Sequence, residues 1–335
     1  MCAKIGIIGG SGYIGYSLAK YLRRNFKVKI LDVKHRKRLE RKIDFACCDV
    51  RSREDVEKGL EDVDLVLHTA IVQIPLINEK KRLGYEVNVN GTQNVCEAVN
   101  KNPRMKGMIL TSSWHTIGEK ELKGVIDEEF GFRPDKVEDR ARLYALSKIA
   151  QESIVRLHDE MSEKIFGIIR MGTVLGGGMP AETAANIFME RGLRGETITP
   201  FKHSMYRPML YVDISDICKA FKRFSLKILN GEAEKEGNSL AHITNVYYPE
   251  AITILELAEI VQKAIVKHTN NTICPKIEIV DTGQKPLFNE DNKKQIKVDI
   301  TKAVNFLGLN KFRSPKESIE EIIKNRIARA AITSR

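Results

Sequence analysis

The sequence lacks several features that would assign it to other classes of protein. No apolar run reaches the roughly 18 residues of a membrane-spanning helix, and the N-terminus passes into glycines without a signal peptide's long apolar region. The six cysteines form neither a CxxC pair nor a metal-ligand spacing with histidine. We therefore expect a cytoplasmic protein with reduced thiols, no bound metal and no membrane partner.

Composition and charge narrow the class further. The 335 residues are 42% hydrophobic and 30% charged, which is typical of a globular protein and not of a disordered polyelectrolyte. The net charge of +11 invites a nucleic-acid hypothesis, and KHRKRLERK at 34–42 is the densest basic cluster. No RNA- or DNA-binding motif accompanies it, so a nucleic-acid partner is not expected. Attraction of an anionic substrate or cofactor is a milder use of the same charge.

The first half of the chain alternates short apolar runs with helical patterns, which is typical of repeated βαβ units. We expect strands at residues 4–8, 27–31, 44–49, 64–69, 105–112 and 165–170, and another at 242–248. The main helical patterns between them are at 13–24, 85–101 and 142–161. The expected fold is therefore α/β, a doubly wound parallel sheet of the Rossmann type.

Beyond residue 172 the sequence changes to loops rich in glycine and proline with short helices between them. We expect a dinucleotide-binding Rossmann domain at 1–172, completed by about 208–246. A smaller C-terminal α/β substrate lobe would comprise 173–207 and 247–335. No internal repeat or low-complexity linker is present, so we expect the two parts to pack together.

A glycine motif indicates what the first part binds. GGSGYIG places Gly9, Gly12 and Gly15 after the first expected strand and at the start of a helix. Without Cβ atoms, such a turn lets a pyrophosphate approach the backbone at the positive end of the helix dipole. Asp32 follows at the end of the second strand, where a carboxylate can hydrogen-bond an adenosine ribose. A dinucleotide cofactor is therefore predicted.

The residues around Asp32 bear on which dinucleotide is bound. A carboxylate at this place binds the ribose 2′-hydroxyl and repels a 2′-phosphate, so NAD is the expected cofactor. Lys34, His35 and Arg36 would offer compensating charge to NADP if Asp32 turned away. NADP therefore stays open as the alternative.

The motif YALSK contains the residues that we expect at the chemical centre. Tyr144 and Lys148 are four apart in a helical pattern, so both project from one helix face. A tyrosine hydroxyl titrates near 10 in water, and a nearby ammonium and an oxidised nicotinamide stabilise its phenolate. The pair can therefore act as a general base, although the spacing by itself also fits a surface tyrosine beside a solvated lysine.

Further landmarks in chain order give the sequence a resemblance to the extended short-chain dehydrogenase/reductase family, and within it to nucleotide-sugar 4-epimerases. Besides GGSGYIG and YALSK they are Asp49-Val50, HTA at 68–70, NVNGT at 88–92, TSSWHTIG at 111–118, RMGTVLGGG at 170–178, RPMLYVD at 207–213 and VDITKAVNFLGL at 298–309. The likeness covers nearly the whole chain.

The resemblance implies roles for individual residues. The catalytic set would be Ser113, which hydrogen-bonds the substrate oxygen, Tyr144, which moves the hydroxyl proton, and Lys148, which holds the nicotinamide ribose. The cofactor site would comprise Gly9, Gly12, Tyr13, Ile14, Gly15, Asp32, Asp49, Val50, Thr69, Ala70, Asn88, Tyr144 and Lys148. A hydride would pass between the nicotinamide and a carbinol carbon of the substrate.

Departures from the family pattern concern the substrate side. Trp114 and His115 stand where dehydratases carry an Asp-Glu pair, so dehydration is not expected, and either residue could contact substrate or be structural. Thr173 replaces an asparagine that many epimerases have. Arg207 remains, but the Gly-Asp-Gly before it is replaced in FKHSMYR. Arg207 could hold a diphosphate, a smaller substrate's carboxylate or phosphate, or a salt bridge between the lobes.

Three functions therefore stay open. The first is an NAD-dependent nucleotide-sugar epimerase. The second is an NAD(P)-dependent dehydrogenase or reductase of a small polar alcohol, such as a sugar acid or an amino-acid-derived alcohol. The third, from another class, is a non-catalytic NAD(P)-sensing or RNA-associated relative. The resemblance also implies a homodimer formed through the helices at 88–100 and 142–160.

Overall fold

The computed structural model describes residues 3–36, 43–235 and 240–333. Cys2 and most of the basic cluster at 34–42 lie outside these ranges. Within them, no helix combines the length and the apolar character that crossing a bilayer requires. The same residues contain no group of three or more histidine, cysteine or acidic side chains that could hold a metal ion.

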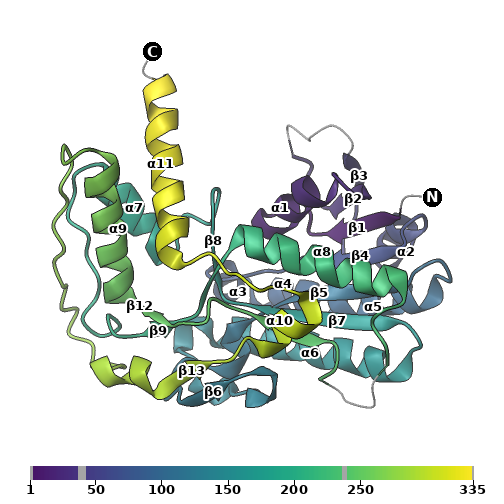
Figure 1. Ribbon diagram of the computed structural model, residues 1–335. Coiled ribbons are helices and arrows are strands. Elements are labelled where there is room, and N and C mark those ends of the chain that lie inside the picture. Colours follow the sequence, from purple (N-terminus) through teal and green to yellow (C-terminus); the bar gives the residue numbers. More distant parts are fainter. Residues whose placement is uncertain (1–2, 37–42, 236–239, 334–335) are drawn as a thin grey trace.

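A parallel sheet of seven strands forms the centre of the larger lobe, with the order β11-β7-β5-β4-β1-β2-β3 (Figure 1). Its strands are β1 (Lys4–Ile8), β2 (Lys27–Asp32), β3 (Ile43–Cys47), β4 (Leu65–His68), β5 (Gly107–Ser113), β7 (Ile165–Met171) and β11 (Ile243–Val246). All seven expected strands are present, with ends shifted by at most two residues. The expected doubly wound α/β fold is therefore confirmed.

Helices cover both faces of this sheet, so its central strands are buried along their whole length. One face packs against α1 (Tyr13–Leu22), α8 (Ile214–Asn230) and α10 (Thr301–Leu307). The other packs against α2 (Arg53–Leu60), α5 (Gly91–Lys101) and α6 (Arg142–Met161). The long apolar runs of the sequence are therefore strands that have no solvent face.

The expected helix at 85–101 is the last part of a longer helical segment. This longer segment begins with α4 (Lys81–Tyr85), widens into a π-helical turn, η1 (Glu86–Asn90), and continues as α5. A short helix, α3 (Leu76–Glu79), precedes it. Short 3₁₀ segments are η2 (Trp114–Ile117), η3 (Glu128–Phe130), η4 (Pro134–Lys136), η5 (Asp139–Ala141) and η6 (Glu290–Gln295).

A second hydrophobic core lies in the smaller lobe, where α11 rises beside α9 and α7 in Figure 1. Its helices are α7 (Ala184–Leu193), α9 (Ile254–His268) and α11 (Pro315–Thr333). The capping box of Thr253 and Glu256 starts α9. Short strand pairs complete the lobe: β8 (Thr173–Leu175) with β10 (Tyr211–Asp213), and β9 (Pro208–Met209) with β12 (Ile252–Thr253).

The chain passes between the two lobes more often than a simple boundary would require. β6 (Gly124–Ile126), from the first half of the chain, pairs with β13 (Ile296–Val298) near its end. In α10, Ala303 and Leu307 pack into the core under the large sheet. The two lobes therefore share segments, and the domain boundaries expected from the sequence stay a prediction.

Candidate active site

A large cavity lies at the carboxyl ends of the central strands and continues to the smaller lobe. Its volume is about 1850 Å³. It includes the place where the strand order reverses, between β1 and β4, which is where open α/β sheets bind ligands. Common ligand pockets measure roughly 300–1,000 Å³, so this cavity has room for a dinucleotide and a second sizeable molecule.

The glycine turn forms one wall of the cavity and has no space for side chains. Gly9 has a φ of +76°, and a Cβ atom there would lie 2.5 Å from the Ala70 backbone nitrogen. A Cβ at Gly15 would lie 2.5 Å from the Gly9 carbonyl oxygen. Gly12 lines the cavity and caps the N-terminus of α1. This bare backbone at a helix N-terminus fits a pyrophosphate.

Asp32 stands at the cavity wall at the end of β2. Its two carboxylate oxygens accept hydrogen bonds from the backbone N–H groups of Ser11 and Lys34, both at 3.0 Å. Arg36 donates to the Ser11 carbonyl oxygen at 2.9 Å, and its guanidinium lies 4.0 Å from the centre of the Tyr16 ring. Asp32 is thus held at the place expected for a ribose contact and has not turned away.

Most of the other expected cofactor residues line the same cavity, namely Tyr13, Ile14, Asp49, Val50, Thr69 and Ala70. Asp49 forms an ion pair with Arg51, whose hydrogen bonds lower the pKa of the carboxyl group. The Thr69 hydroxyl donates to the Ile8 carbonyl oxygen at 2.8 Å, which ties β4 to β1 below the glycine turn.

Asn88 lies behind the cavity wall and is fully buried in the π-helical turn. Its side chain accepts a hydrogen bond from the Val72 backbone N–H at 2.7 Å and donates to the Val72 carbonyl oxygen at 2.9 Å. It also donates to the Ser147 hydroxyl at 3.0 Å. Asn88 therefore joins the loop after β4 to α6, which positions the cavity wall.

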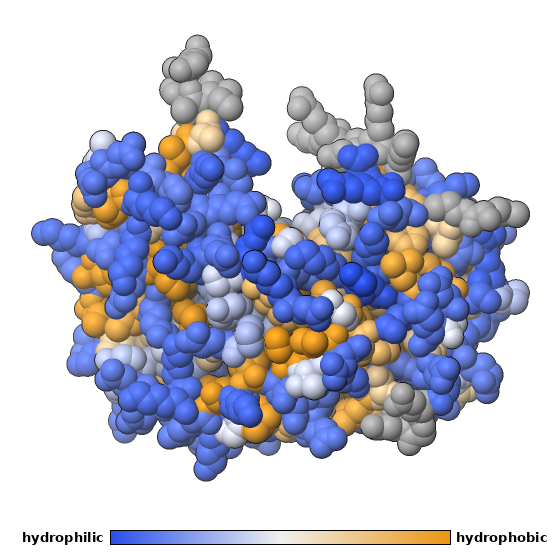
Figure 2. Space-filling model, viewed as in Figure 1, coloured by the Kyte–Doolittle hydropathy of each residue, from blue (hydrophilic) through white to orange (hydrophobic). Residues whose placement is uncertain are grey.

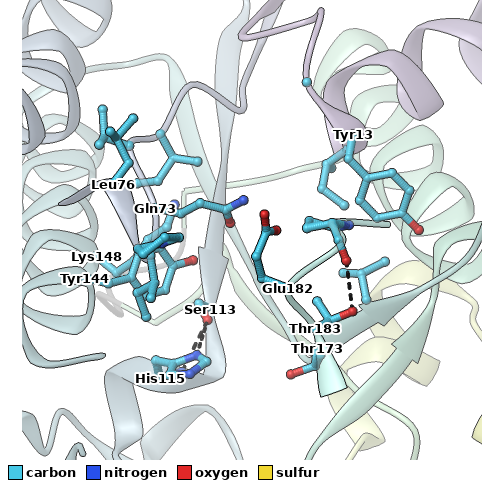
Figure 3. Close-up of a pocket in the computed structure, with 18 of the residues that line it drawn as sticks. Tyr13, Gln73, Leu76, Ser113, His115, Tyr144, Lys148, Thr173, Glu182 and Thr183 are labelled. Atoms are coloured by element: carbon cyan, nitrogen blue, oxygen red, sulfur yellow. Dashed lines mark hydrogen bonds between the residues drawn. The ribbon is translucent and has the colours of Figure 1, made fainter. Parts of the chain in front are cut away.

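Ser113, Tyr144 and Lys148 come together at the cavity floor, where β5 ends beside α6 (Figure 3). The Lys148 ammonium donates to the Thr111 carbonyl oxygen at 2.7 Å, and burial lowers its pKa to about 7. Burial raises the pKa of Tyr144 to about 12, and a hydrogen bond with Ser113 acts in the opposite direction. The tyrosine is therefore a neutral phenol in this structure.

His115 extends this group toward the substrate side. Its Nδ1 lies 3.0 Å from the Ser113 hydroxyl oxygen, and its ring meets the Tyr144 ring edge to face at 5.6 Å. Burial, with the nearby charges of Arg140 and Arg207, lowers the pKa of His115 to about 3, so the imidazole is neutral. Trp114 is 1% exposed.

Thr173 faces this group from the opposite wall. The indole N–H of Trp114 donates to its hydroxyl oxygen at 3.3 Å. Figure 3 shows Thr173, Glu182 and Tyr13 opposite Ser113, Tyr144 and Lys148. The Trp114 indole and the Thr173 hydroxyl are thereby partnered with each other within the protein.

Arg207 forms a buried ion pair with Glu138. Its guanidinium also lies 5.5 Å from the centre of the Phe288 ring. The second oxygen of Glu138 accepts a hydrogen bond from Arg140 at 3.0 Å. Close by, burial and the charge of Glu138 raise the pKa of Glu119. The salt bridge that was one of three alternatives for Arg207 is therefore present.

Several cavity residues carry no signal in the sequence. Glu138 sits in an irregular loop, and its ion-pair partner is far away in the chain. Figure 3 shows Gln73 and Glu182 pointing toward each other from opposite walls. Four large apolar side chains of the cavity wall remain partly exposed: Leu76, Ile187, Phe201 and Leu287. None of these belongs to a motif with a recognisable spacing.

Solved structures of similar fold cover almost the whole chain. UDP-glucose 4-epimerase from Thermus thermophilus, in complex with NAD, has a TM-score of 0.73 at 21% identity and aligns with 96% of this chain and 99% of that one. UDP-glucuronic acid 4-epimerase from Bacillus cereus, in complex with NAD, has a TM-score of 0.74 at 20% identity with the same coverage. These similarities show the shared fold.

Curated relatives match a shorter region. Sterol-4-alpha-carboxylate 3-dehydrogenase, decarboxylating, from Bos taurus is 30% identical over 174 residues, 51% of this chain and 46% of the relative. The inverting UDP-N-acetylglucosamine 4,6-dehydratase of Campylobacter jejuni is 24% identical over 184 residues, 51% of this chain and 48% of the relative. The chain matches these relatives over about half of their length.

The family assignment rests on the larger part of the chain. Residues 5–238 match the family described as NAD dependent epimerase/dehydratase, a region that contains the glycine turn, Asp32 and the group at the cavity floor. The expected cofactor, NAD, agrees with this match. With its sheet order and its glycine turn, the chain therefore belongs to the NAD-dependent epimerase/dehydratase family.

Proposed function

We propose that this chain catalyses hydride transfer between NAD and a carbinol carbon of its substrate, with Tyr144 as the group that moves the hydroxyl proton. The observation that supports this most directly is the meeting of Ser113, Tyr144 and Lys148 in the cavity that the glycine turn lines. A protein that only senses the cofactor has no need of a proton-transfer residue.

The arrangement gives each side chain a distinct task. When bound, NAD supplies the hydride acceptor and a positive charge on its nicotinamide ring. Tyr144 accepts the substrate's hydroxyl proton, and the Lys148 charge stabilises the phenolate, which burial alone disfavours. Ser113 hydrogen-bonds the reacting oxygen. His115 stays neutral and holds the Ser113 hydroxyl through Nδ1.

For the net reaction we propose oxidation of a secondary alcohol, or reduction of the matching ketone. The supporting observation is the Arg207–Glu138 ion pair, because a diphosphate would have to compete with Glu138 for this arginine. The similarity to a 3-dehydrogenase points in the same direction.

Nucleotide-sugar 4-epimerisation is the second candidate, favoured by the near-complete coverage of two 4-epimerases that act on such sugars. An epimerase returns its hydride to the substrate and leaves no NADH. Absorbance at 340 nm therefore separates the two reactions once a turnover signal is found.

The decisive variant is Tyr144→Phe, which removes one oxygen and keeps the ring packing. We expect turnover to fall by about 10² to 10⁴, the range of general acid-base catalysis, with NAD affinity almost unchanged. Ser113→Ala should lower the rate with little effect on NAD binding, because its proposed partner is the substrate oxygen. A Tyr144→Phe enzyme that keeps more than about a tenth of wild-type turnover would remove Tyr144 from this role.

A further inference from the structure

We propose that the substrate of this enzyme is an alcohol or ketone with an apolar body and without an anionic group beside Arg207. This inference rests on the proposed function and names its substrate class. Two independent features of the cavity carry it, a set of exposed apolar side chains in its lining and an arginine that is already held in a buried ion pair.

The apolar wall is our name for four large side chains that line the cavity and come from four separate segments. Leu76 is 40% exposed, Ile187 41%, Phe201 48% and Leu287 46%, and all four line the cavity. Figure 2 shows orange, apolar side chains in several places on this face, among mostly hydrophilic ones. Such side chains are normally covered, and an exposed apolar group inside a ligand cavity is typical of an apolar ligand.

The wall continues from these exposed side chains into the buried interior. Phe188 and Met209 line the cavity and are 5% and 8% exposed. Ile254, at the start of α9, lines it as well and is 7% exposed. Buried apolar side chains of the second hydrophobic core therefore also take part in the cavity lining.

Arg207 is a cation of the cavity lining that a phosphate or carboxylate on the substrate could use, and it is held in a buried ion pair by Glu138. Both side chains are less than a tenth exposed, so they attract each other with little screening by water. An anionic ligand would have to compete with Glu138 for Arg207, and displacing Glu138 would leave its carboxylate with Arg140 alone. The Glu138 carboxylate therefore acts as an internal substitute for a substrate anion.

Glu182 is a second acidic residue that disfavours an anionic substrate. Glu182 lines the cavity, and in Figure 3 its carboxylate points into the space between the two walls. A negative charge at this place repels an anionic substrate and still accepts a hydrogen bond from a hydroxyl group. Glu182 and the Glu138-bound Arg207 therefore suit hydroxyl or carbonyl oxygens more than phosphates.

The first test measures binding of alkan-2-ols, from butan-2-ol to octan-2-ol, to the NAD-saturated Tyr144→Phe enzyme, so that turnover does not interfere. Calorimetry should show the dissociation constant falling about three- to fourfold with each added methylene group. Phe201→Ser and Leu287→Ser should flatten this dependence. Val125→Ser, a partly exposed apolar side chain of β6, is the matched control and should keep it.

The second test uses inorganic pyrophosphate on the NAD-saturated wild-type enzyme. Arg207→Gln should leave its weak binding unchanged, whereas Glu138→Gln should tighten it at least tenfold by freeing Arg207. Asp135→Asn makes the same charge change three residues away, on an exposed side chain outside the cavity lining, and should have no effect.

Two results overturn the proposal: affinity that does not depend on alcohol chain length, or wild-type pyrophosphate binding that Arg207→Gln abolishes. The wild-type and Arg207→Gln comparison remains decisive if Glu138→Gln fails to fold. Either result leaves the proposed hydride transfer intact, because that depends on the activity of Tyr144→Phe and not on these binding constants.

Discussion

At the scale of single residues, burial sets the protonation of the groups at the cavity floor. Burial keeps Tyr144 as a neutral phenol. It also lowers the pKa of Lys148 to about 7, because both side chains are removed from water. Their chemistry therefore needs the charge of the bound cofactor in addition to their own side chains. The same reasoning explains why His115, buried beside two arginines, stays neutral.

The lowered pKa of Lys148 predicts a pH dependence of stability. Between about pH 7 and its ordinary value of 10.5, the unfolded chain binds a proton that the native chain lacks. The free energy of unfolding of cofactor-free wild type should therefore rise with pH relative to Lys148→Met, by up to about 1.4 kcal/mol per pH unit. Urea unfolding of both proteins from pH 6 to 9 measures this. A difference that is constant with pH would contradict it.

Asp32 predicts the cofactor preference. Its carboxylate is held by the backbone at the end of β2, so it should repel the 2′-phosphate of NADP. Wild type should bind NAD more tightly than NADP, and Asp32→Ala should narrow the difference because Arg36 then faces the phosphate without a competing acid. Fluorescence titration of both cofactors tests this, and tighter NADP binding by wild type would overturn it.

At the scale of elements, α6 serves two surfaces at once. Its buried face carries Lys148 toward the cavity, while Leu146, Leu157 and Met161 are exposed along its other side. These three residues fall on one stripe of a helix with 3.6 residues per turn. α5 packs beside α6, so the expected homodimer, formed through the helices at 88–100 and 142–160, would bury this stripe.

Leu157→Glu is the variant that tests this dimer. A charge in the middle of a packed apolar interface should convert the dimer to a monomer, because burying it without a partner is unfavourable. Sedimentation equilibrium gives the mass directly. Val125→Glu, on exposed β6, should leave the mass unchanged, and a wild-type monomer would show the prediction to be wrong.

At the scale of the whole molecule, the cavity lies where the two lobes meet, so ligand binding should couple them. Between residues 173 and 207, the smaller lobe contributes β8, α7 and the loops around them to the cavity. We expect these residues to exchange amide hydrogens faster than the central strands, and to slow when octan-2-ol is added to the NAD-saturated Tyr144→Phe enzyme. Equal protection of residues 173–207 with and without octan-2-ol would count against this coupling.

Short-range patterns were enough to predict much of this protein. The strands follow from apolar runs, the turn at Gly9 from its glycines, and the pairing of Tyr144 with Lys148 from helical spacing. In each case the physical cause acts within a few residues: steric freedom, helix periodicity, or the burial of a whole strand. The sheet order then follows because parallel βαβ units allow few arrangements.

Only the tertiary structure decided what surrounds Ser113, Tyr144 and Lys148 in the cavity. Arg207 forms its ion pair with Glu138, 69 residues away in the chain, and the Asn88 side chain accepts a hydrogen bond from the backbone of Val72. The apolar wall brings together side chains from four segments, none of which has a pattern of its own. Such contacts depend on how the lobes pack. The sequence by itself determined the fold, the glycine turn and the place of Asp32 at the end of β2, whereas the shape and charge of the rest of the cavity came from long-range packing.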